Sequence, residues 1–75
     1  MVLLELKQGE RATILDLSKV NDIVKRRLLD LGIMEGENIL LKNRMPFRGP
    51  IMLDHSGQCL GIRYQEAAQI EIERT

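Results

Sequence analysis

The chain has 75 residues, which corresponds to one domain with a thin core. Hydrophobic residues make up 44% of it and aromatic residues only 3%, so we expect a core of Leu, Ile, Val and Met. The 11 basic and 11 acidic residues cancel, and the absence of a basic excess argues against a general nucleic-acid or membrane-surface binder. The single cysteine, Cys59, excludes an internal disulfide and suits a reducing cytosol.

The start of the chain does not have the pattern of a signal peptide, because Glu5 and Lys7 interrupt the apolar run that begins at Met1. No apolar run approaches the ~20 residues that a membrane span needs. We therefore expect a cytoplasmic protein without direct membrane insertion.

The first third of the chain predicts one barrel strand and a helix, preceded by a short apolar lead. Val2–Leu6 is a candidate edge strand, and Arg11–Leu17 is a strand with apolar residues on both faces. Asn21 is a candidate helix N-cap. The helix should end at Gly32, since glycine commonly follows a helix end. An apolar stripe at i, i+4 and i+7 should be buried, namely Val24, Leu28 and Leu31.

Two further residues of this helix receive opposite predictions. Ile23 is expected to widen the buried stripe, whereas Leu29 lies off it and should face solvent or a neighbour. After Gly36, which suits a turn into a strand, the apolar period changes to two.

The rest of the chain alternates in short segments. In the strand Glu37–Met45, three residues should share one face: Ile39, Leu41 and Met45. Next we expect a rigid connection at Pro46–Pro50, a strand around Ile51 and Leu53, and a tight turn at His55–Gly57. A strand with Leu60 and Ile62 should follow, and Gly61 within it predicts a bulge or close packing. The chain should end with a helical turn at Tyr64–Ala68 and a last strand with Ile70 and Ile72.

Five short strands, tight turns and one short helix predict a mainly β protein. The fold should be a small, strongly curved antiparallel β-barrel, with the helix inserted after the first barrel strand, in a single domain over residues 1–75. Closure of such a barrel limits exposed strand edges.

Four blocks of the sequence resemble the ferrous iron transport protein A family (FeoA), with the right spacing between them. They are Leu3–Gly9, Arg27–Gly36, Met45–Pro50, and Leu60–Arg63 followed by Glu66–Ile70. One departure is that Arg48-Gly49 stands where the family commonly has Gly-Asp before the second proline of the loop.

This resemblance implies an SH3-like barrel and a non-enzymatic, cytosolic accessory role in ferrous iron uptake. The implied partner is the membrane ferrous iron transporter with a cytosolic GTP-binding domain, ferrous iron transport protein B. The module also resembles a C-terminal domain of metal-dependent repressors. The alternative function is therefore a metal-sensing regulatory module.

The sequence does not predict a catalytic site. Asp54, His55 and Ser56 are adjacent, and neighbouring strand residues point to opposite faces, which suits no proton relay. No metal site is expected either. His55 and Cys59 are weak candidate ligands, but they make only half a tetrahedral site. We expect no cofactor, and at most weak or adventitious transition-metal binding.

Five basic residues are candidates for a nucleic-acid-binding face, namely Arg26, Arg27, Lys42, Arg44 and Arg48. Phe47 and Tyr64 are the sole aromatic residues, too few for base stacking, so no nucleic-acid partner is expected.

A protein-docking surface is expected near the helix end and the Pro46–Pro50 loop. The candidate contact residues are Arg26, Arg27, Leu29, Met34, Phe47 and Arg48. The structural alternatives are that the thin core recruits Met34, and that Arg27 merely pairs with Asp30 or Glu35. An exposed strand edge would also favour homo-oligomers.

Overall fold

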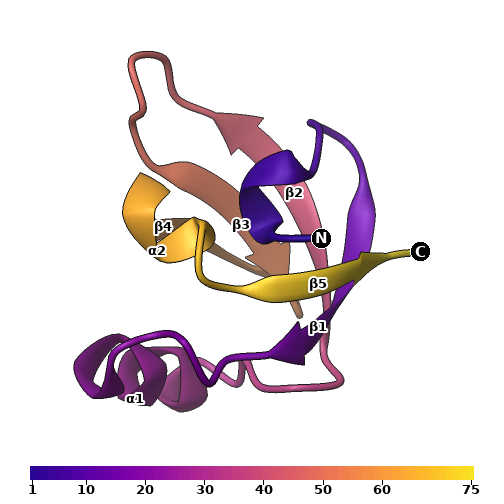
Figure 1. Ribbon diagram of the computed structural model, residues 1–75. Helices are drawn as coiled ribbons and strands as arrows, with labels where there is room; N and C mark the ends of the chain where they lie inside the picture. The colour runs from indigo at the N-terminus through magenta and orange to yellow at the C-terminus, as the bar shows by residue number, and fades with distance from the viewer.

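In the computed structural model, which describes residues 1–75, the chain forms five strands, two helices and one 3-10 turn (Figure 1). In chain order these are η1 (Leu3–Glu5), β1 (Arg11–Asp16), α1 (Asp22–Asp30), β2 (Asn38–Arg44), β3 (Ile51–His55), β4 (Gln58–Ile62), α2 (Tyr64–Ala67) and β5 (Glu71–Arg74). All neighbouring strands are antiparallel, in the order β4-β3-β2-β1-β5. As expected, the fold is mainly β and antiparallel, with a helix after the first strand.

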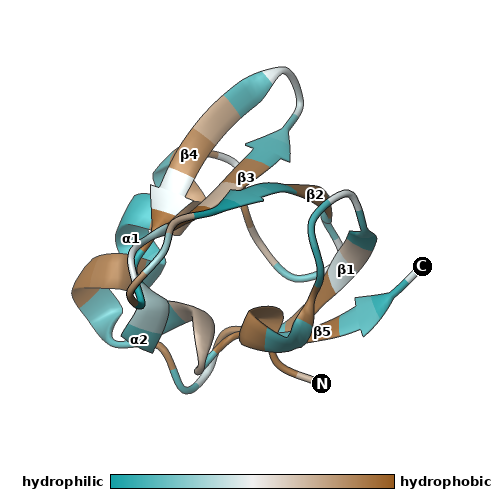
Figure 2. Ribbon diagram, turned by 90° about the horizontal axis from the view of Figure 1, so that it is seen from above, coloured by the Kyte–Doolittle hydropathy of each residue, from teal (hydrophilic) through white to brown (hydrophobic).

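The sheet curls strongly on itself (Figure 2). Its inner side chains form one aliphatic core. Leu28 of α1 and Ile39 of β2 both belong to this core, as the periodicity predicts. Alternate residues of the strands supply half of the rest, namely Ala12, Ile14, Leu41, Ile51, Leu53, Leu60, Ile62 and Ile72. Burial of this apolar surface is the main force that closes so small a domain.

Local signals set both ends of α1. The Asn21 side chain accepts a hydrogen bond from the backbone N–H of Val24 at 3.0 Å. At the other end Gly32 takes a left-handed φ of +81°. The N–H of Gly32 then bonds the carbonyl of Leu29 at 2.9 Å, and the N–H of Ile33 bonds that of Leu28 at 2.8 Å. The Asn21 hydrogen bond confirms the predicted N-cap, and the two backbone hydrogen bonds after the helix confirm the predicted stop at Gly32.

The predicted edge strand at Val2–Leu6 is wrong. Only Val2 makes a strand-like bridge, to Glu71, and the next three residues form η1. The Glu5 carboxylate accepts a hydrogen bond from the Val2 N–H at 2.8 Å. This tight turn directs Leu3 and Leu6 inward, and both are fully buried. The apolar spacing here is three residues, which suits a 3-10 turn rather than a strand.

Two strand details also differ from the prediction. Met45 does not share the inner face with Ile39 and Leu41, because β2 ends at Arg44 and the β2–β3 register shifts between Leu41 and Asn43. A bulge of this kind interrupts side-chain alternation, which leaves Met45 partly exposed. The bulge predicted at Gly61 does not occur, because the β3–β4 register is unbroken.

At Gly61 the structure shows an ordinary van der Waals contact with Met52, so the predicted close packing does not occur either. Gly61 lies directly opposite Met52 in an unbroken β3–β4 register. A Cβ atom added to Gly61 would lie 3.5 Å from the Met52 sulfur.

The turn that precedes β4 is the predicted one, since Ser56 and Gly57 both have positive φ and join His55 to its partner Gln58.

Candidate protein-docking surfaces

The outer face of α1 carries large apolar side chains. Ile23 is 84% exposed and Leu29 is 46% exposed, and Arg26 lies between them on the same side of the helix. The prediction that Ile23 joins the buried stripe is wrong. Successive helical residues are about 100° apart, so burial of Val24 and Leu28 turns Ile23 toward solvent. Met34, which follows the helix end, is also exposed.

Arg27 has a defined structural contact. Its guanidinium lies 3.3 Å from the carboxylate of Glu66, which is buried in α2. The same carboxylate oxygen also accepts the backbone N–H of Arg63 at 3.3 Å. The structural alternative, in which Arg27 pairs with Asp30 or Glu35, does not occur. Arg27 instead connects α1 to α2.

The β2–β3 loop presents Phe47, which is 99% exposed. Its ends are fixed by hydrogen bonds from the Met45 N–H to the Pro50 carbonyl and from the Gly49 N–H to the Pro46 carbonyl, both at 3.1 Å. Phe47 and Arg48 both have φ of 59°, a left-handed conformation that is unfavourable for residues with a Cβ atom. The Arg48 guanidinium lies over the Tyr64 ring, 5.8 Å from its centroid.

The structure does not bring all six predicted contact residues together. Figure 1 places α1 and the β2–β3 loop at opposite ends of the molecule. Arg26, Leu29 and Met34 belong to the helix end, and Phe47 and Arg48 belong to the loop. The single expected surface is therefore two surfaces, which we call the α1 surface and the loop surface.

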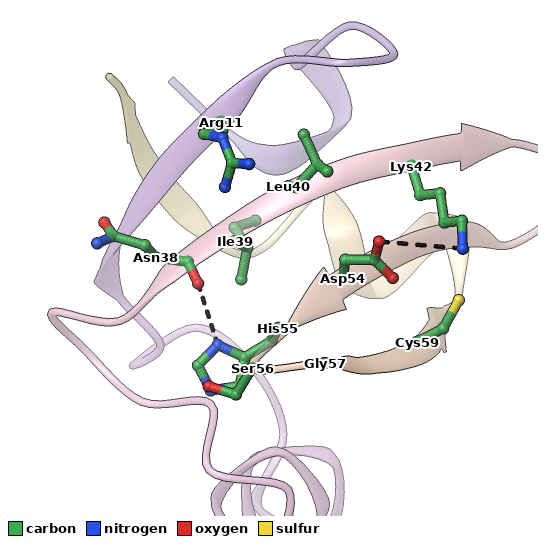
Figure 3. Close-up of a pocket in the computed structure, with 10 residues that line it drawn as sticks. All are labelled: Arg11, Asn38, Ile39, Leu40, Lys42, Asp54, His55, Ser56, Gly57 and Cys59. Carbon is green, nitrogen blue, oxygen red and sulfur yellow. Dashed lines mark hydrogen bonds and ion pairs between the residues drawn. The ribbon is translucent and has the colours of Figure 1, made fainter.

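A shallow pocket of about 380 Å³ lies at the outer face of β2, β3 and β4 (Figure 3). Its lining includes Arg11, Leu40 and Cys59, together with an ion pair at 4.0 Å between Lys42 and Asp54. The lining is mainly polar and its charged groups have both signs.

His55 and Cys59 point to opposite faces of the sheet. His55 is buried, and its Nδ1 lies 3.0 Å from the Asn38 carbonyl while its Nε2 lies 3.4 Å from the Glu37 carboxylate. Cys59 is exposed and faces outward beside its cross-strand partner Asp54. The two side chains are therefore not placed to share a metal ion, and the structure contains no cluster of three or more candidate ligands.

These features can be compared with known proteins. The model of the FeoA domain matches residues 1–74. The chain belongs to the FeoA family. The Fe(2+) transport protein A of Campylobacter jejuni is 32% identical to it over 72 residues, which cover 96% of each chain. The family consists of ferrous iron transport accessory proteins and is not a family of known enzymes.

Solved FeoA structures show the same architecture. FeoA from Chlorobium tepidum matches with a TM-score of 0.91 and 34% identity, over 99% of this chain and 70% of that one. FeoA from Stenotrophomonas maltophilia, solved with zinc and described as a prokaryotic SH3 domain protein, matches with a TM-score of 0.75 and 27% identity, over 97% and 89%. The predicted SH3-like barrel is thus confirmed.

A manganese-dependent transcriptional repressor shares the fold alone. It matches with a TM-score of 0.88 and 20% identity, over all of this chain and 36% of that one.

None of the helices is suited to crossing a lipid bilayer.

Proposed function

We propose that this FeoA protein is a non-enzymatic, cytosolic accessory protein that docks on the cytosolic part of the membrane ferrous iron transporter with a GTP-binding domain, ferrous iron transport protein B. There it promotes or regulates transport. Family membership supports the link to ferrous iron transport. The observation that supports docking is the α1 surface, where Ile23, Leu29 and Met34 are exposed around Arg26.

The α1 surface has the composition and rigidity of a docking site. Methionine and arginine are enriched at protein interfaces, and burial of exposed aliphatic side chains supplies free energy. The Asn21 cap and the Gly32 closure hold both ends of α1, and the Arg27–Glu66 pair ties it to α2. Little conformational entropy would therefore be lost when a partner binds this surface.

The loop surface is the proposed second contact. Phe47 is the most exposed large apolar side chain of the chain, and aromatic residues often dominate binding energy. Because the two surfaces lie at opposite ends, they would contact separate parts of a partner. Each can therefore be tested by itself.

The binding test measures the affinity of the purified chain for the cytosolic domains of the transporter, with and without guanine nucleotide. We expect Ile23→Asp combined with Leu29→Asp to weaken binding at least about tenfold, since each places a charge in an apolar contact. Phe47→Ala tests the loop surface. Gln65→Asp on α2 is the control for an added surface charge. Wild-type affinity in the α1 double variant would contradict docking through α1.

The functional test is uptake of ferrous iron in a strain that lacks this protein. The wild-type chain should restore uptake, and the α1 double variant should restore less of it at equal protein level. Failure of the wild-type chain to restore uptake would contradict the accessory role itself. Circular dichroism of the purified variants confirms that any loss does not come from unfolding.

No specific observation favours the alternative, a metal-sensing regulatory module. The repressor likeness concerns the fold, and the two candidate ligands face opposite sides of the sheet. Equilibrium dialysis with ferrous iron decides between the two functions. Tight stoichiometric binding that is lost in His55→Ala would favour the metal-sensing module.

A further inference from the structure

The two outer strands of the sheet differ in how their free edges are protected. The outward edge of β5 is covered by the start of the chain, because the Leu3 N–H bonds the Ile70 carbonyl at 2.9 Å and the Ile72 N–H bonds the Met1 carbonyl at 2.8 Å. Strand β4 pairs with β3 on one side, and no strand or bridge pairs with its other side. Figure 2 shows the β3–β4 hairpin projecting from the body.

The register identifies which groups of β4 are unpaired. The two-residue turn makes His55 and Gln58 a hydrogen-bonded pair, so Leu53–Leu60 and Ile51–Ile62 are also hydrogen-bonded pairs. Cys59 and Gly61 belong to the alternate pairs, and their N–H and C=O groups point away from β3. No other segment of the chain bonds these groups.

Strand β4 also lacks the features by which proteins protect an exposed edge. Charged side chains, proline and bulges commonly prevent edge-to-edge pairing. Strand β4 reads Gln-Cys-Leu-Gly-Ile, with no charge and no proline, and its register is unbroken. By contrast, β5 carries three charged residues, Glu71, Glu73 and Arg74.

We propose that β4 pairs antiparallel with β4 of a second copy of this chain, about a two-fold axis beside Leu60. In this register Cys59 of each copy lies opposite Gly61 of the other. Each of these residues donates one backbone hydrogen bond and accepts one, which satisfies the outward groups of both strands. The two Leu60 side chains meet on the inner face. The inference does not depend on docking to the transporter.

Charge and shape favour a second copy of this chain as the partner that pairs with the free edge of β4. The chain has a formal net charge of zero, so two copies do not repel each other at long range. No charged residues oppose each other in this register, and Gly61 leaves room for the Cys59 side chain. The contact is only five residues long on each side, which predicts a weak dimer rather than an obligate one.

The test combines sedimentation velocity with amide hydrogen exchange of the full chain in reductant. We expect reversible dimer formation as the protein concentration rises. The amides of Cys59 and Gly61 should then become protected, while the Leu60 amide, which bonds β3, should be protected at every concentration. A chain that stays monomeric throughout, or that gains protection at α1 instead, would overturn the proposal.

Variants separate backbone pairing from thiol chemistry. Cys59→Pro removes an outward N–H and no β3 bond, and it should raise the dimer dissociation constant at least about tenfold. Cys59→Lys, which adds an edge charge and keeps the N–H, should also weaken the dimer if the proline variant does not fold. Cys59→Ser should dimerise like wild type. Unchanged dimerisation in the proline or lysine variant would overturn the proposal, as would its loss in the serine variant.

Discussion

Asp16 shows how one side chain shapes the turn from β1 toward α1. Its carboxylate accepts the backbone N–H of Ser18 and the hydroxyl of the same serine, both at 2.9 Å. The backbone hydrogen bond is the main cause, and the hydroxyl the second, of a pKa for Asp16 below its ordinary value of 3.8. Asp and Ser favour such turns because their side chains bond the backbone locally.

We predict that Ser18→Ala raises the pKa of Asp16 part of the way toward its ordinary value, because the hydroxyl is lost and the backbone N–H remains. A carbon-detected NMR titration of the Asp16 carboxyl measures this. Lys19→Ala is the control, and its effect should be smaller because Lys19 is the weakest of the causes. An unchanged pKa in Ser18→Ala would contradict the assigned hydrogen bond.

The sign of the pH dependence follows from the lowered pKa. The folded state binds the Asp16 proton less tightly than the unfolded state does. The stabilising contribution is therefore present above the unfolded pKa and is lost as the pH falls through the lower folded pKa. The contribution is therefore fully present at neutral pH, and stability depends on the titration of Asp16 only in acid.

At the scale of elements, α1 and α2 are held together by a contact between residues 39 positions apart, Arg27 and Glu66. Glu66 is buried and also bonds the backbone N–H of Arg63, at the start of α2. Loss of the arginine would leave a buried carboxylate with a single donor, which is costly in a low-dielectric environment.

We predict that Arg27→Ala lowers the free energy of unfolding by about 1–2 kcal/mol. Arg26→Ala is the matched control on the same helix, and it should change stability by less than about 0.5 kcal/mol because its side chain is exposed and makes no ion pair. Urea denaturation followed by circular dichroism measures both. Equal effects of the two variants would show that the Arg27–Glu66 pair does not stabilise the fold.

At the scale of the whole molecule, the N-terminal segment completes the barrel. Its η1 turn packs against α2. Leu3 and Leu6 are fully buried, and the Leu6 carbonyl accepts a hydrogen bond from the Arg44 guanidinium at 2.6 Å. The same segment covers the edge of β5. These few residues therefore join both ends of the chain to the sheet.

We predict that Leu3→Ala lowers the free energy of unfolding by about 2–5 kcal/mol, because a buried leucine leaves a cavity. That is a large share of the roughly 4–11 kcal/mol that a domain of this size has in total. Thermal unfolding should show a strongly lowered midpoint. Leu4→Ala, at a partly buried neighbour, is the control and should cost much less. A midpoint close to that of wild type would mean that the barrel closes without Leu3.

The sequence by itself determined the features that arise within a few residues of the chain. These are the cap at Asn21, the helix stop at Gly32 and the turn at Ser56-Gly57. Composition also determined that the core is aliphatic. Only the tertiary structure decided that Ile23 is exposed, that Arg27 pairs with Glu66, and that His55 and Cys59 face opposite sides of the sheet. It also divided the expected docking surface in two. Caps and turns depend on local backbone geometry, whereas such contacts depend on strand register and on the curl of the sheet, which distant residues set together.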